Sequence, residues 1–226
     1  MDDLTWNLLV MAGCYTYIVA IILVSERLPF SKKVNRKVLH AMIGNLPLVM
    51  PLFSAPIYSF LVASPFILVT FLATPYSPVK LPGRLSSLTE EGHSLGLVMY
   101  AISYSALAWL YGATPYVVAA GIFPMAYGDS AAALIGQYYG KHKYKLTELK
   151  SFEGSAAMLA GSFFSVLLGL LYFSWFFNTA FVNIIGTAAA IAVLVTIVEG
   201  VAPRGLDNIA VPAVGALTLI LLNGGV

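Results

Sequence analysis

Long apolar segments recur along the whole chain and are separated by short polar turns. Most approach the roughly 20 residues that a helix needs to cross a bilayer. The apolar residues are continuous rather than alternating, which indicates helices rather than strands. We place eight segments, near residues 4–24, 38–53, 56–74, 95–112, 115–137, 154–176, 179–199 and 208–223. The pattern predicts an all-α, polytopic membrane protein that forms a single domain over residues 1–226.

Three local features refine this prediction. Pro47 and Pro51 lie in the second segment, so we expect it to be kinked or broken. Residues 1–10 carry no basic residue and no clear cleavage site, so we expect a retained helix rather than a signal peptide. The single cysteine, Cys14, excludes an internal disulfide and is expected to be a small buried side chain in the first helix.

The basic residues predict the orientation of the helices. With eight crossings, every Lys and Arg falls on one side of the membrane, and the turns near residues 54–55, 112–113 and 177–179 carry none. The positive-inside rule makes that side cytoplasmic and places both termini on the other side. The basic residues of these loops are Arg27, Lys32, Lys33, Arg36, Lys37, Lys80, Arg84, Lys141, Lys143, Lys145, Lys150 and Arg204.

Composition supports the membrane prediction and makes certain acids conspicuous. The mean hydropathy is +0.86, which excludes an ordinary soluble domain. Only 10% of residues are charged, yet Asp129, Glu153, Glu199 and Asp207 lie at or inside the predicted helix ends on the basic side. Ionisable groups at membrane depth are costly, and they usually mark a functional site.

Carboxylates beside lysines suggest chemistry on phosphate groups. Mg²⁺ takes few protein carboxylates and completes its shell with water and substrate phosphates. Asp129 is the leading metal-ligand candidate, followed by Asp207, Glu199 and Glu153. Lysines neutralise charge as it develops on phosphates, and four of them lie between the fifth and sixth segments: Lys141, Lys143, Lys145 and Lys150.

Several of these residues also have structural interpretations. Gly128, Gly140 and Gly154 permit close approach of either a phosphate or a neighbouring helix. Ser151 fits a helix N-cap as well as an anion contact, and the pair Asp207–Asn208 is also a common N-cap. Arg36 and His40 are four residues apart and so share a helix face. From spacing alone they are a snorkelling cation and an interfacial histidine.

Four motifs together resemble the integral-membrane polyprenol kinase family, which includes dolichol, phytol and CTP-dependent diacylglycerol kinases and is related to phosphatidate cytidylyltransferases. The resemblance spans residues 36–212, and the motifs are RKVLH, GDSAAALIGQYYGKHKYK, KSFEGSAA and VEGVAPRGLDNIAVP. It implies a kinase that moves the γ-phosphate of CTP to the hydroxyl of a polyprenol-type lipid with Mg²⁺ or another divalent cation. The expected location is the cell membrane, with the active site facing the cytoplasm.

The resemblance also implies roles for individual residues. Asp129 and Glu153 become catalytic candidates, and Arg36 and His40 join them. Glu199 and Asp207 join Asp129 as candidate metal ligands. The implied nucleotide-binding residues are Gly128, Gly140, Lys141, Lys143, Lys150, Ser151, Gly154, Asp207 and Asn208.

The lipid and the exact reaction stay open at this point. A C20 prenol, a dolichol and diacylglycerol all fit the sequence, and no nucleic-acid partner is predicted. A cytidylyltransferase that makes a CDP-lipid is the alternative enzyme. An ion-coupled transporter is a further alternative, although no convincing internal repeat supports it.

Overall fold

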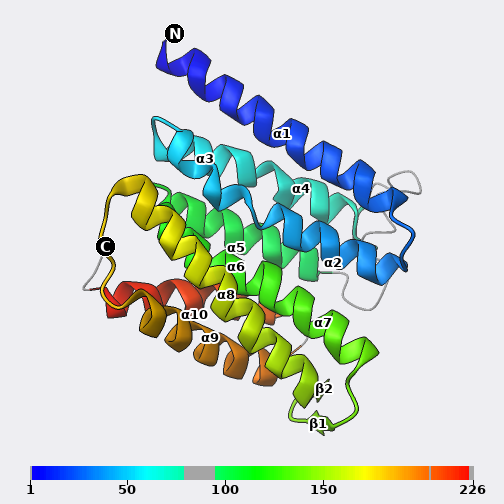
Figure 1. Cartoon of the computed structure of the whole chain (residues 1–226). Helices are drawn as coiled ribbons and strands as arrows, with labels where there is room; N and C mark the ends of the chain where they lie inside the picture. Colours follow the sequence, from blue (N-terminus) through cyan, green and yellow to red (C-terminus); the bar gives the residue numbers. More distant parts are fainter. Residues whose placement is uncertain (1, 79–94, 204, 224–226) are drawn as a thin grey trace.

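The computed structural model of the chain describes residues 2–78, 95–203 and 205–223 (Figure 1). Helices make up most of this part. The helices are α1 (Asp3–Arg27), α2 (Lys32–Ile43), α3 (Pro56–Ala63), α4 (Pro65–Leu72), α5 (Gly96–Tyr111), α6 (Pro115–Phe123), α7 (Asp129–Tyr138), α8 (Phe152–Phe177), α9 (Ile184–Val201) and α10 (Asp207–Leu222). A π-helical turn, Pro124–Gly128, joins α6 to α7.

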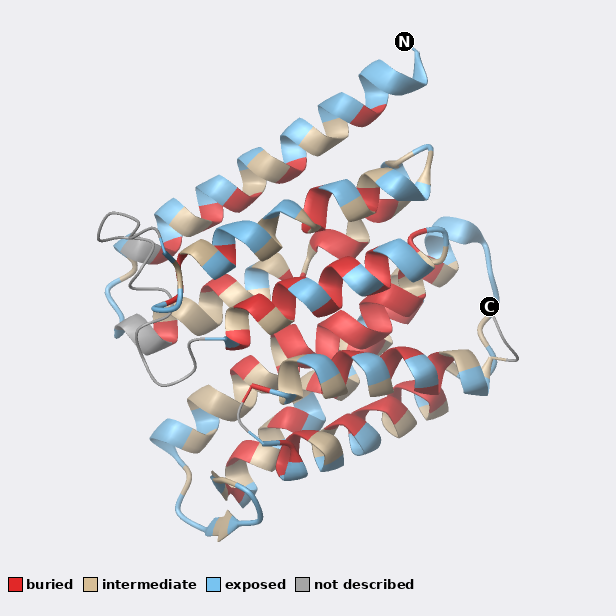
Figure 2. Cartoon of the chain, turned by 180° about the vertical axis from the view of Figure 1, so that it is seen from behind, coloured by how far each residue is buried: buried red, intermediate tan, exposed pale blue. Residues whose placement is uncertain are grey.

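The core of the bundle is built around α6, which packs against α5, α8 and α10. Val117, Val118 and Ile122 on this helix have no exposed surface. At the edge of the bundle, α1 packs against α2 and α3 and leaves most of its surface uncovered (Figure 2). Its uncovered side chains include Leu9 and Val24, which are more than half exposed. An apolar outer surface of this kind suits contact with lipid.

The membrane character predicted from hydropathy is supported by helix length. Among the described residues, four helical stretches are long and apolar enough to cross a bilayer: Asp3–Ser25, Pro115–Tyr138, Phe152–Phe177 and Ile184–Val201. Three shorter apolar stretches, Pro56–Leu72, Gly96–Tyr111 and Asp207–Leu222, accompany them. The count of eight crossings and the orientation of the termini stay predictions. Lys80, Arg84 and Arg204, which entered the orientation argument, lie outside the described residues.

The predicted break in the second segment is confirmed. Helix α2 ends at Ile43, and two short 3₁₀ turns, Leu46–Leu48 and Met50–Leu52, continue the chain. Pro47 and Pro51 each lie inside one of these turns. A proline lacks the N–H that an α-helix needs and clashes with the preceding turn, so the helix cannot continue through either residue.

The all-α prediction is wrong in one place, because the segment between α7 and α8 forms a small β-hairpin. Strands β1 (Lys143–Lys145) and β2 (Leu149–Ser151) pair antiparallel, with Tyr144 opposite Lys150. Three-residue strands rich in lysine give too little alternation to be recognised from sequence. The hairpin lies at the end of the bundle away from both chain termini, where α7 and α9 also end and α2 and α10 begin (Figure 1).

Candidate active site

A pocket of about 600 Å³ opens at this end of the bundle. Helices α2, α5, α7, α8, α9 and α10 and the hairpin all contribute to its lining. Its charged lining residues are Arg36, Lys37, Lys143 and Lys150, together with Asp129, Glu148, Glu199 and Asp207. The volume lies within the range of small-molecule sites. Three of the acids singled out from the sequence therefore meet in one cavity.

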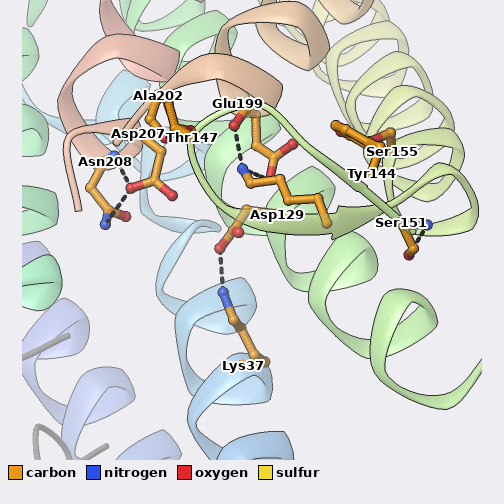
Figure 3. Close-up of polar contacts among 12 residues, drawn as sticks. Lys37, Asp129, Tyr144, Thr147, Ser151, Ser155, Glu199, Ala202, Asp207 and Asn208 are labelled. Carbon is orange, nitrogen blue, oxygen red and sulfur yellow. Dashed lines mark hydrogen bonds and ion pairs between the residues drawn. The ribbon is translucent and has the colours of Figure 1, made fainter. Parts of the chain in front are cut away.

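Asp129 is the first residue of α7, and its carboxylate forms an ion pair with Lys37 of α2 (Figure 3). The two side chains are mostly covered, with 20% of Asp129 and 14% of Lys37 exposed. The neighbouring Ser130 strengthens the junction, because its hydroxyl donates to the Lys37 carbonyl at 3.1 Å. Carboxylate and ammonium therefore neutralise each other inside the pocket.

Lys150 of β2 forms the second ion pair of the pocket. Its ammonium donates to the carboxylate and to the backbone carbonyl of Glu199, near the end of α9. Other contacts also attach the hairpin: Thr147 donates to the Ala202 carbonyl at 3.3 Å, and the hydroxyls of Tyr144 and Ser155 lie 2.6 Å apart. These contacts hold the hairpin against the helices and keep Lys150 in the pocket.

The start of α10 supplies the third acid. One Asp207 carboxylate oxygen accepts from the Asn208 backbone N–H at 2.9 Å and faces the Asn208 amide at 3.2 Å. The Asn208 carbonyl accepts from the Ser103 hydroxyl of α5 at 2.6 Å. Figure 3 shows Asp207 and Glu199 on the same side of Asp129, opposite Lys37.

Helices α7 and α8 approach closely at the pocket wall. A Cβ placed on Gly154 would lie 3.0 Å from the Ala132 carbonyl and 3.3 Å from the Gly136 Cα. Only glycine fits this contact without displacing the backbone. The capping interpretation of Ser151 is confirmed, because its hydroxyl accepts from the Gly154 N–H at 3.1 Å. Ser151 and Gly154 also line the pocket.

Four predicted site residues are not part of the pocket lining, namely Gly128, Gly140, Lys141 and Glu153. Glu153 instead accepts from the His142 backbone N–H, at 3.2 and 3.3 Å, and pairs with its ring Nδ1 at 2.7 Å. Gly128 faces α8, since a Cβ there would lie 2.3 Å from the Ser162 hydroxyl. Glu153 and Gly128 therefore both make contacts that stabilise the structure outside the pocket.

Lys37 is a pocket residue that sequence reasoning missed. The RKVLH motif led to Arg36 and His40, both of which line the pocket, while Lys37 was assigned only to the basic loop. The sequence does contain a signal for Lys37: it precedes His40 by three residues, and residues three apart on a helix are neighbours on its surface. Its partner Asp129 lies 92 positions further along the chain.

Comparison with known proteins shows which family this chain resembles. A phytol kinase of Synechocystis sp. is 31% identical over 210 residues, which cover 89% of this chain and 86% of the relative. A wheat (Triticum aestivum) protein named "Probable phytol kinase, chloroplastic" is 29% identical over 233 residues, or 96% of this chain and 77% of the relative.

The chain belongs to the phytol kinase family. The resemblance predicted from the four motifs is thereby confirmed. No family model matches the chain, and no solved structure matches it. The match to the wheat protein extends over 96% of this chain, so the pocket lies within it.

The donor set of the pocket suits a weakly held divalent cation. Among the described residues, no group of three or more His, Cys, Asp or Glu side chains is placed to hold a metal ion by itself. Asp129 and Glu199 are each paired with a lysine. Mg²⁺ needs only one or two protein carboxylates when substrate phosphates and water supply the rest. Asp129, Glu199 and Asp207 are the carboxylates of the pocket that can serve in this way.

Proposed function

We propose that the chain is a CTP-dependent kinase for isoprenoid alcohols such as phytol. In this reaction the alcohol oxygen forms a bond to the γ-phosphorus of CTP, and the bond from that phosphorus to the bridging oxygen breaks. CDP leaves, the alkyl phosphate forms, and the hydroxyl proton is released. Membership of the phytol kinase family supports the reaction class and the acceptor.

The observation that carries the proposal is the meeting of four cations and four acids in one pocket. A triphosphate bears several negative charges, and its transfer depends on cations placed around the phosphates. Lys143 and Lys150 come from the hairpin, and Arg36 and Lys37 come from α2. We assign these four side chains to the phosphates of CTP.

The acids are assigned to a divalent cation. Asp129 is the principal ligand in this proposal, with Glu199 or Asp207 as the second. A bound cation would supply charge neutralisation for the β- and γ-phosphates. Lys37 and Lys150 hold two of these carboxylates in position before the nucleotide arrives, because Lys37 pairs with Asp129 and Lys150 pairs with Glu199.

The location of the pocket fits a substrate that is half in the membrane. The elements that line the pocket meet at one end of the bundle, beside the hairpin (Figure 1). At such an end a lipid hydroxyl at the membrane interface and a soluble nucleotide would both have access. We propose that this end faces the cytoplasm of a cell in which the chain occupies the cell membrane. The basic residues at this end, among them Lys143 and Lys150, support that orientation.

Purified protein in detergent or nanodiscs tests the proposal directly. γ-Labelled CTP, ATP, GTP and UTP are each supplied with phytol, geranylgeraniol, a dolichol and diacylglycerol. We expect label in the alkyl phosphate, with CTP as the best donor and a C20 prenol as the best acceptor. Equal transfer from all four nucleotides would contradict the CTP assignment.

Product analysis separates the kinase from the alternative enzyme. A cytidylyltransferase given CTP and a phosphorylated lipid releases pyrophosphate and leaves a CDP-lipid, whereas the kinase releases CDP. Finding CDP-lipid and pyrophosphate would replace the kinase proposal. Ion flux in liposomes without CTP turnover would favour the transporter.

A further inference from the structure

Two buried polar atoms at the inner edge of the pocket have no hydrogen-bond partner among the residues that the structure describes. They are Nε2 of His40 on α2 and the hydroxyl of Tyr100 on α5. The two rings are in contact, with centroids 4.1 Å apart and planes inclined by 55°. Only 4% of Tyr100 is exposed. Buried polar groups are nearly always paired, so an adjacent unpaired couple indicates a missing partner.

The position of the couple connects the pocket with the apolar interior. His40 lines the pocket, and so does Gly96, one helical turn before Tyr100 on α5. Because residues four apart share a helix face, Tyr100 continues the pocket wall into the bundle. One turn deeper, Tyr104 is again 4% exposed and its ring contacts Tyr100. The couple therefore lies between the charged lining of the pocket and the buried core.

The hydrogen-bonding properties of His40 Nε2 and the Tyr100 hydroxyl indicate what kind of group would pair with them. With the ring proton on Nδ1, His40 Nε2 accepts a hydrogen bond, and the Tyr100 hydroxyl can donate one. An alcohol hydroxyl donates and accepts at once, so it has both of the functions that these two atoms require. A phosphate is a poorer fit, because burying its charge beside the core requires paired cations. Arg36 and Lys37, which line the pocket, supply those cations outside the couple.

We infer that His40 and Tyr100 form the binding site for the hydroxyl of the acceptor alcohol. The hydroxyl donates to His40 Nε2 and accepts from Tyr100, and this orients its oxygen toward the phosphates in the pocket. The inference rests on the proposed kinase function. Both atoms are covered in this structure, so the alcohol enters when the His40 ring turns, a side-chain adjustment of the kind common on binding.

The deciding experiment compares Tyr100→Phe with Tyr104→Phe in the purified full-length chain. Each change removes one unpaired, buried hydroxyl from α5 and keeps the aromatic ring. We expect Tyr100→Phe to raise the KM for the alcohol roughly tenfold, the effect of losing one neutral hydrogen bond. The KM for CTP should stay within about twofold in both variants, and Tyr104→Phe should leave the alcohol KM unchanged.

A second pair of variants tests the acceptor atom on His40. Gln places an amide oxygen or nitrogen near the position of Nε2, whereas Leu places only carbon there. We expect His40→Gln to retain at least about ten times the kcat/KM for the alcohol that His40→Leu retains. Equal losses in the two variants would mean that the ring serves only packing, and they would overturn the inference.

The outcomes separate this inference from the function on which it rests. If the unmodified chain phosphorylates none of the alcohols, the proposed function fails and the inference fails with it. If the chain is active and Tyr100→Phe keeps the KM of the unmodified chain, the kinase stands and the hydroxyl site is overturned. If Tyr100→Phe and Tyr104→Phe raise the alcohol KM equally, the effect is structural and the site is again overturned.

Discussion

Lys37 on α2 and Asp129 on α7 form an ion pair at the wall of the pocket. The two residues lie on separate helices and are 92 positions apart in the chain. Breaking such a pair leaves a charge without compensation in a largely covered position. The position of the Asp129 carboxylate in the pocket therefore depends on how α2 packs against α7. Substitutions of these two residues are the first tests of the site.

Replacing Asp129 with Asn should abolish most of the activity. The change keeps the size of the side chain and removes the charge that we assign to the cation and to Lys37. We expect kcat to fall by about 100-fold or more, a typical loss for a group that stabilises transition-state charge. Asp3→Asn, at the far end of α1, is the control and should retain full activity. Full activity in Asp129→Asn would contradict the metal assignment.

Replacing Lys37 with Met should lower stability as well as activity. Asp129 would lose its partner, and because both side chains keep some exposure we expect a loss of about 2 kcal/mol, less than for a fully buried pair. Reversible unfolding of the purified chain measures this. The Lys37→Met/Asp129→Asn double variant should lose less than the sum of the single variants. Strict additivity would mean that the pair contributes nothing to stability.

Lys141 and Lys143, which the sequence linked to CTP, should differ in their effect on nucleotide binding. Lys143 lines the pocket and donates to the Gly136 carbonyl at 3.3 Å, whereas Lys141 is not part of the lining. We expect Lys143→Met to raise the KM for CTP roughly tenfold, as expected for a lost charge-assisted contact. Lys141→Met is the matched control and should change this KM by less than about twofold. Equal effects would argue for a nucleotide site that extends over the whole hairpin.

Gly128 should prove important for packing. An added Cβ would lie 2.3 Å from the Ser162 hydroxyl and 2.8 Å from the Met158 sulfur. We expect Gly128→Ala to lower the free energy of unfolding by about 1–3 kcal/mol, the usual effect of overpacking. Gly13→Ala is the control, because nothing lies within 4 Å of the Cβ it would add. A Gly128→Ala protein as stable as this control would be inconsistent with the close contact between the π-helical turn and α8.

Removal of divalent cations should stop the reaction. Because Asp129 and Glu199 are paired with lysines, we expect the cation to bind together with the nucleotide rather than before it. EDTA should abolish turnover, and Mg²⁺ should restore it. The electron paramagnetic resonance spectrum of Mn²⁺ should broaden when CTP is added to the chain, and it should not do so with Asp129→Asn. Turnover that persists in EDTA would remove the cation from the proposal.

Part of the site was predictable because its signals are local. Acids at the ends of apolar segments are conspicuous wherever the segments pack, so Asp129, Glu199 and Asp207 were recognised from the sequence and do line one pocket. The capping role of Ser151 was also foreseen, because it depends on the next three residues. The contact between Glu153 and His142 was not foreseen, because it depends on how the hairpin folds back onto the start of α8.

The sequence by itself determined the membrane class, most helix positions, the break at Pro47 and Pro51 and the family, since all of these follow from hydropathy, backbone chemistry and contiguous motifs. Only the tertiary structure decided that Lys37 pairs with Asp129 and that the His40 ring lies against Tyr100. Helical periodicity fixes which residues share a face, but the facing helix depends on how the bundle packs. Partners between distant segments therefore have no signature in either segment alone.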